Sequence, residues 1–173
     1  EISHSPRYGI SLKGESHPGG IRAWGIDVQN SDRWLYDSQS MIYDLRFSQN
    51  NYIAYNDLYD CMKETRDGGI FETNSAGRGN VFENNLVHDT ASADKHGMFF
   101  GIYIDGSSVN WRVEKNIVYN LSSQGGGCAI MINPGIYNQV QNNIIDGFNG
   151  NADGVTIVGR NTVFNKNILY SPE

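Results

Sequence analysis

Two aspartates, Asp67 and Asp105, occupy positions that the rest of the chain does not repeat. Asp67 precedes Gly68-Gly69, a pair that lets the backbone pass close to another group. Asp105 ends an alternating apolar segment, at an outward position where similar segments carry Lys, Thr, Asn or Val. Two such carboxylates on one face could serve as the acid and base, or the acid and nucleophile, of glycoside cleavage. Solvated turn aspartates are the alternative interpretation.

Other side chains could line the same site. His96 lies in Lys95-His96-Gly97, just ahead of the Asp105 segment, and Arg66 lies beside Asp67, where it could bind substrate or remain solvated. Outward aromatic rings could form stacking platforms for sugars, and the candidates are Trp24, Trp34, Phe71 and Tyr103. Three further aspartates follow a recurring unit, so turn or hydrogen-bonding roles explain them: Asp60, Asp89 and Asp146.

The elements that must position these residues come from an internal repeat. An Asn followed by two β-prone apolar residues recurs five times, at Asn56, Asn85, Asn116, Asn143 and Asn167. The separations, 29, 31, 27 and 24 residues, suit the coils of a solenoid. Propeller blades would need tight hairpin turns with Asn-Gly or Asp-Gly signals, which are mostly missing. In a stack of coils, equivalent asparagines lie about 4.8 Å apart and can bond to one another as a ladder.

Each repeat holds three short strands, and no stretch shows helical periodicity. The sequence therefore predicts an all-β protein, a right-handed parallel β-helix with three sheets and about five to six coils. One strand per coil alternates with period 2, which predicts two inward columns on one wall. The first column is Ile10, Ile70, Ile102, Ile130 and Val155, and the second is Leu12, Glu72, Ile104, Ile132 and Ile157. Glu72 is the one charged residue in an otherwise apolar inward column. It therefore either pairs with a buried partner or marks a shift of the strand register.

A single β-helix domain is expected over residues 1–173. The coil repeat is interrupted at about residues 14–50, which are expected to form a loop excursion. Long loops of this kind are usually functional or disordered, and the aromatic content argues against disorder. Solenoid ends need caps, and no capping helix is recognisable, so the chain is expected to be an excerpt of a longer β-helix. The cysteines, Cys61 and Cys128, share no metal-ligand spacing.

The composition of the chain argues against two classes of binding partner, nucleic acids and membranes. The net charge of -6 argues against a nucleic-acid surface, and no run of about 18 apolar residues is present that would span a membrane. Neither a metal nor another cofactor is expected. The oligomeric state stays open.

Several segments of the sequence resemble those of the pectin-lyase-like right-handed β-helix proteins. They are residues 4–12, 55–61, 64–71 and 101–108, and the likeness covers nearly the whole chain outside 14–50. Within that group the chain resembles glycoside hydrolases of family 141 and their relatives. The resemblance implies a secreted or periplasmic enzyme acting on an oligo- or polysaccharide, with Asp67 and Asp105 as the catalytic pair.

The β-xylosidases of family 120 also look similar around Gly101–Asp105, where their nucleophile matches Asp105. Their acid/base glutamate would fall near Asn133, which cannot donate a proton in that role, so Asn133 is expected to bind substrate instead. The prediction is therefore a glycoside hydrolase acting on plant or microbial polysaccharide. Two alternatives stay open: a polysaccharide lyase using Lys13, Lys63, Arg66 or Arg112 against a uronate, and a non-catalytic carbohydrate-binding or structural β-helix.

Overall fold

The computed structural model describes residues 1–14, 48–150 and 154–170. These residues form three parallel sheets of five strands each, and no helix. The first sheet contains β1 (Ile10–Lys13), β4 (Asp67–Asn74), β7 (Met98–Val109), β10 (Gly126–Ile136) and β13 (Val155–Ile157). The second contains β2 (Tyr52–Ala54), β5 (Val81–Glu83), β8 (Arg112–Glu114), β11 (Gln139–Gln141) and β14 (Val163–Asn165). The third contains β3 (Asp57–Tyr59), β6 (Leu86–Ser92), β9 (Ile117–Ser123), β12 (Ile144–Gly150) and β15 (Ile168–Tyr170).

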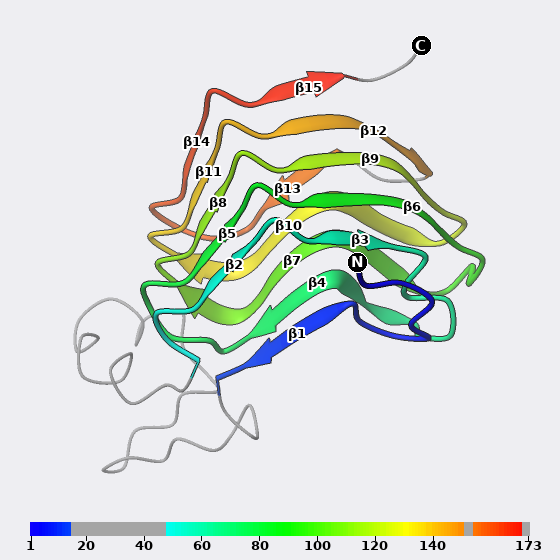
Figure 1. Cartoon of the computed structure of the whole chain (residues 1–173), viewed down its shortest axis with the longest axis horizontal. Coiled ribbons are helices and arrows are strands. Elements are labelled where there is room, and N and C mark those ends of the chain that lie inside the picture. Colours follow the sequence, from blue (N-terminus) through cyan, green and yellow to red (C-terminus); the bar gives the residue numbers. More distant parts are fainter. Residues whose placement is uncertain (15–47, 151–153, 171–173) are drawn as a thin grey trace.

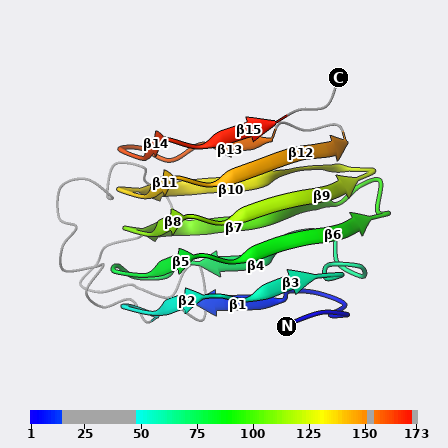
Figure 2. The ribbon, with the colours of Figure 1, turned by 45° about the horizontal axis from the view of Figure 1, so that its top comes forward.

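Successive strands of the chain pass to successive sheets, so the backbone winds as a right-handed parallel β-helix (Figure 1). Figure 2 shows the rungs stacked one above another from β1 to β15. The predicted fold class is thereby confirmed, and the expected coils appear as five strands in every sheet. The described part of the chain includes no helix that could cross a membrane.

The recurring asparagines form the predicted ladder. Asn85 Nδ2 donates to Asn116 Oδ1 (3.1 Å), and Asn116 Nδ2 donates to Asn143 Oδ1 (3.0 Å). The ladder continues outward to Asn56 and Asn167 at 2.9 Å each. The residue before each ladder Asn has a left-handed backbone, with φ between 54° and 60°, and these residues are Tyr55, Asn84, Lys115, Asn142 and Lys166. The ladder therefore bonds across a sharp bend between the second and third sheets, where strand pairing is interrupted.

The interior is lined by one aliphatic or aromatic column from each of the second and third sheets. The columns are Ile53, Phe82, Val113, Val140 and Phe164, and Leu58, Val87, Val118, Ile145 and Leu169. Phe71 from the first sheet stacks on Phe82 with ring centroids 4.0 Å apart and contacts Trp111 at 5.6 Å. All three rings are fully buried, so they form the centre of the core.

The predicted register of the first sheet is wrong at one coil. Ile10 pairs with Phe71 rather than Ile70, and Leu12 pairs with Thr73, so Phe71 and Thr73 take the inward positions. Glu72 consequently points outward, between Ser11 and Tyr103. The predicted columns, which match Ile10 with Ile70, place Gly9 beside Gly69. The pairing instead places Gly9 beside Ile70, whose carbonyl accepts a hydrogen bond from Gly9 N (2.8 Å).

Most of the predicted excursion at 14–50, including Trp24 and Trp34, lies outside the described residues. Its two ends are close together, since the hydroxyl of Ser48 donates to the carbonyl of Lys13 (2.7 Å). The chain therefore leaves the first sheet after β1 and rejoins the coil at nearly the same place, immediately before β2.

Candidate active site on the first sheet

Asp105 is held from both sides by amides on the neighbouring coils. The register places Asn74, Asp105 and Asn133 in one outward column of β4, β7 and β10. Asn74 Nδ2 donates to Asp105 Oδ2 (3.0 Å), and Asn133 Nδ2 donates to Asp105 Oδ1 (3.2 Å). Each carboxylate oxygen thus has its own donor, which fixes the orientation of the group on the wall. The sequence indicated Asn133 as a site residue, but Asn74 was missed because of the register slip.

Tyr103 lies beside this column and is almost completely buried. Its ring packs against Phe100 with centroids 4.3 Å apart, and its hydroxyl lies 3.3 Å from Asn133 Nδ2. Burial raises the pKa of Tyr103, the hydrogen bond from Asn133 opposes this, and the charges of Asp105 and Asp67 add to the increase. Tyr103 is therefore a neutral phenol across the physiological range. Because only 4 % of it is exposed, it supports the wall rather than offering a sugar platform.

Glu72 is a third carboxylate on this wall, which the predicted inward orientation concealed. It is buried, with 4 % exposed, and forms an ion pair with Lys13 from β1. A side chain at Gly68, where φ is 148°, would approach within 2.6 Å of the Tyr8 ring and 2.9 Å of Glu72 Oε2. Gly68 is therefore required for the close approach that the sequence predicted. A glutamate in an otherwise apolar column was the signal that could have revealed the outward position.

Asp67 begins β4 and pairs with Met98, seven positions before the point where Asp105 pairs with Asn74. A straight strand would place the two aspartates about 23 Å apart along its axis. The strands of this sheet are arched (Figure 1), and the left-handed Gly68 follows Asp67 directly. Partial desolvation raises the pKa of Asp67, which remains exposed at the start of β4; the charge of Asp105 raises it further, and Arg7 and Lys13 oppose both effects.

The remaining predicted site residues divide into two groups. Arg66 Nε lies 3.1 Å from Asp94 Oδ2, and the backbone N–H of His96 donates to Asp94 Oδ1 (2.9 Å). Because Met98 N also donates to the carbonyl of Arg66 (2.6 Å), this exposed loop lies next to Asp67. Phe71, in contrast, faces the core and cannot contact substrate, so its predicted outward orientation is wrong.

Two of the three recurring aspartates have the predicted turn role. Asp60 and Asp89 have left-handed backbones, with φ of 53° and 44°, and the N–H of Asp60 bonds to the carbonyl of Asp89. Asp89 interrupts the pairing of β6 with β9, whereas Asp146 pairs regularly within β12, with Tyr119 and Tyr170 as its partners. Within residues 1–14, 48–150 and 154–170, no group of three or more His, Cys, Asp or Glu side chains is arranged to hold a metal ion.

Comparison with protein-family models, curated proteins and solved structures gives no match to this chain.

Proposed function

We propose that the protein is a glycoside hydrolase in which Asp67 is the acid and Asp105 the nucleophile or base. The observation that carries the proposal is the contrast between the two environments. Asp105 accepts hydrogen bonds from Asn74 and Asn133, as an oriented carboxylate must. Asp67, at the exposed start of β4, has a raised pKa because of partial desolvation and the charge of Asp105. Two carboxyl groups in different environments are the pattern of acid and base assignments in glycosidases.

The resemblance to hydrolases of family 141 supports the same pair. We further propose that the enzyme is secreted or periplasmic and that its substrate is a polysaccharide. The reaction needs one carboxyl to protonate the departing glycosidic oxygen, and a raised pKa keeps Asp67 protonated further toward neutral pH. It also needs one carboxylate that stays in place against the anomeric carbon. The two amides that hold Asp105 meet that requirement.

The test is to measure turnover by the full-length protein. The substrates are polysaccharides and aryl glycosides whose leaving groups differ in acidity. We expect Asp67→Asn to cost about 100- to 10,000-fold on natural glycosides, the usual contribution of general acid catalysis. The loss should shrink on aryl glycosides whose phenol leaves without protonation. Asp105→Asn should lose turnover on every substrate, because the nucleophile or base is needed whatever the leaving group.

Asp146→Asn is the matched control, since it makes the same chemical change at an exposed aspartate on the third sheet. Its turnover should equal that of the wild type. Wild-type turnover by Asp105→Asn, with Asp146→Asn unchanged, would show that the pair is not catalytic. An inactive wild type across the panel would favour the non-catalytic alternative.

A polysaccharide lyase is less well supported by the contacts of the cations that it would use. Each of the four is paired with a carboxylate: Lys13 with Glu72, Lys63 with Asp60, Arg66 with Asp94 and Arg112 with Glu114. A lyase needs such a cation to neutralise the uronate while a base takes the C5 proton. The same assays monitor ultraviolet absorbance, because an unsaturated product would identify a lyase.

A further inference from the structure

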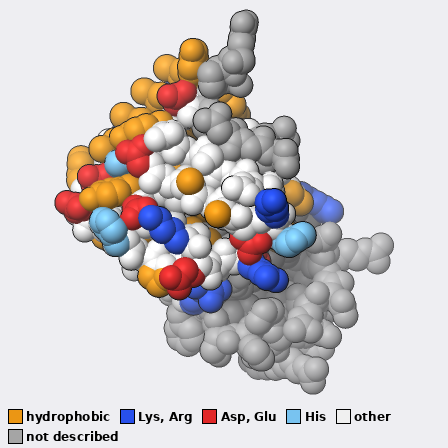
Figure 3. Space-filling view, turned by 90° about the vertical axis from the view of Figure 1, so that its right-hand side faces the viewer, with side chains coloured by type: hydrophobic (Ala, Val, Ile, Leu, Met, Phe, Trp, Pro, Cys, Tyr) orange, Lys and Arg blue, Asp and Glu red, His pale blue; other side chains and the backbone are white. Residues whose placement is uncertain are grey.

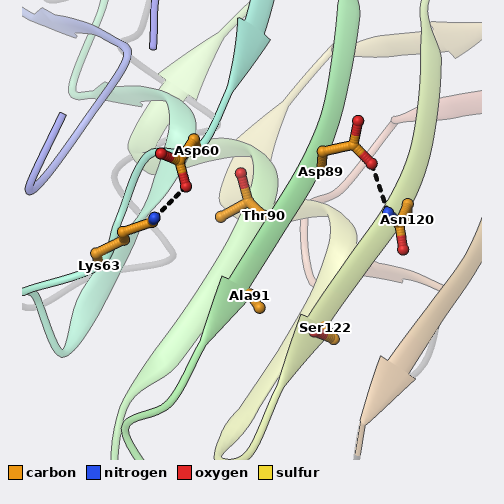
Figure 4. A pocket seen from close by; sticks show the side chains of 7 residues that line it. All are labelled: Asp60, Lys63, Asp89, Thr90, Ala91, Asn120 and Ser122. Atoms are coloured by element: carbon orange, nitrogen blue, oxygen red, sulfur yellow. Dashed lines mark hydrogen bonds and ion pairs between the residues drawn. The ribbon is translucent and has the colours of Figure 1, made fainter. Parts of the chain in front are cut away.

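A pocket lies away from the first sheet, on the outer side of the third sheet. It has a volume of about 310 Å³ and is lined by Asp60, Lys63, Asp89, Thr90, Ala91, Asn120 and Ser122. Figure 4 shows that these residues come from the turn after β3 and from the adjacent strands β6 and β9. We call this site the turn pocket.

The charged side chains that line the turn pocket are all paired with neighbouring groups. The Lys63 ammonium pairs with Asp60 Oδ1, and His4 Nε2 lies 3.4 Å from Asp60 Oδ2. The other carboxylate, Asp89, accepts from the Asn120 amide through Oδ1 and contacts His88 Nδ1 (2.8 Å) through Oδ2. Figure 3 shows acidic and basic side chains interspersed on the face seen at the right of Figure 1. Each carboxylate oxygen keeps a further lone pair for a ligand.

These features decide the class of ligand. An apolar molecule would find only the methyl groups of Thr90 and Ala91 among the polar groups that line the pocket. An anion would have to compete with two carboxylates, and Lys63 is already paired. A divalent cation would meet two carboxylates that are each bonded to other groups. A neutral molecule with several hydroxyls can donate to Asp60 and Asp89 and accept from Lys63, Asn120 and the hydroxyl of Ser122.

We propose that the turn pocket binds a neutral sugar residue, as a non-catalytic site separate from the wall that holds Asp105. Its volume is at the small end of ligand pockets, which run from roughly 300 to 1,000 Å³, and suits one or two sugar rings. The inference does not depend on hydrolysis, because it concerns binding on a different sheet.

The test is binding of neutral methyl glycosides of glucose, galactose, mannose, xylose and fucose, measured by ligand-observed saturation-transfer NMR on the whole chain. Ala91→Trp should fill the pocket and weaken binding at least tenfold. Ala91 and Ser122 are exposed or half-exposed neighbours on β6 and β9, where an added aromatic ring is tolerated. Leu86→Trp is the matched control, since it adds the same ring on β6 outside the pocket, and its affinity should be unchanged.

Asp105→Asn separates the two sites, and binding to the turn pocket should survive in that variant. The inference is overturned if no methyl glycoside binds at millimolar concentration, or if Asp105→Asn removes the binding while Ala91→Trp keeps it. Stronger binding of glucuronate or glucosamine than of the neutral glycosides would overturn the assignment to neutral sugars. Should Ala91→Trp fail to fold, Lys63→Met and Ser122→Ala are expected to weaken the same binding, and unchanged affinity in both would overturn the proposal.

Discussion

His88 sits in the third sheet between two carboxylates and two aromatic rings. Its Nε2 lies 2.6 Å from Asp57 Oδ1, and its Nδ1 lies 2.8 Å from Asp89 Oδ2. Its ring stacks between Tyr59 and Tyr119, with centroids 5.3 and 4.7 Å away. Burial lowers the pKa of His88, but the hydrogen bonds and charges of Asp57 and Asp89 outweigh that effect, so the pKa is raised overall. Both ring nitrogens face acceptors, which requires the imidazolium form.

The raised pKa of His88 predicts how the stability of the protein depends on pH. A histidine with a folded pKa above its unfolded value of about 6.5 contributes fully below that pH, and the contribution is lost as pH rises through the folded pKa. We expect His88→Gln to cost about 1–3 kcal/mol of unfolding free energy at pH 6, the usual value of hydrogen bonds to charged groups. The cost should be smaller at pH 9 than at pH 6, because the contribution of the charged imidazolium is lost as pH rises through the raised pKa.

Urea unfolding of both proteins at the two pH values measures this difference. The wild-type free energy of unfolding should fall more steeply from pH 6 to pH 9 than that of His88→Gln. Parallel curves for the two proteins would mean that His88 does not titrate in this range.

At the scale of the strands and bends, the asparagine ladder joins every coil to the next. Asn116 is fully buried and takes part in four side-chain bonds. Its amide donates to Phe82 O and Asn143 Oδ1, and its Oδ1 accepts from the N–H and the amide of Asn85. Each bond satisfies a group that water cannot reach, so removing the side chain leaves buried partners unpaired.

We therefore expect Asn116→Ala to cost about 2–4 kcal/mol, from lost hydrogen bonds and unsatisfied partners. Asn56→Ala is the matched control. Its amide donates to Ala54 O and Asn85 Oδ1 at the partly buried first rung, so its loss should cost clearly less. Equal losses in urea unfolding would show that the ladder does not depend on burial.

At the scale of the whole molecule, the three sheets enclose one core that runs along the helix axis. Phe71 of the first sheet and Phe82 of the second sheet stack at its centre, and Trp111 packs against them. Phe164 occupies the same column as Phe82 at the last coil, where 39 % of it is exposed.

Phe71→Ala should therefore cost about 3–5 kcal/mol, as expected for a buried aromatic ring that leaves a cavity. Phe164→Ala makes the same chemical change in a half-exposed position, so its cost should be much smaller. Thermal and urea unfolding measure both. A mild effect of Phe71→Ala would contradict the inward position of that ring and restore the register read from the sequence.

The sequence by itself determined the architecture. Asn56, Asn85, Asn116, Asn143 and Asn167 recur at coil spacing because each must bond to its equivalents above and below, and this requirement is visible without coordinates. Asp105 could also be identified from the sequence as a candidate site residue, because the equivalent positions of the other coils carry different residue types. These features depend on local patterns that repeat, or fail to repeat, along the chain.

Only the tertiary structure decided which face each side chain of β4 occupies. A shift of one residue reverses every side chain in a strand, and the glycines before Phe71 made two registers fit the apolar pattern. Strand pairing selected the register that turns Phe71 into the core and places Glu72 and Asn74 on the outer face of the sheet. The amides that hold Asp105, and the turn pocket on the third sheet, join residues from different coils. Their contacts depend on how the coils stack, which the order of residues alone does not specify.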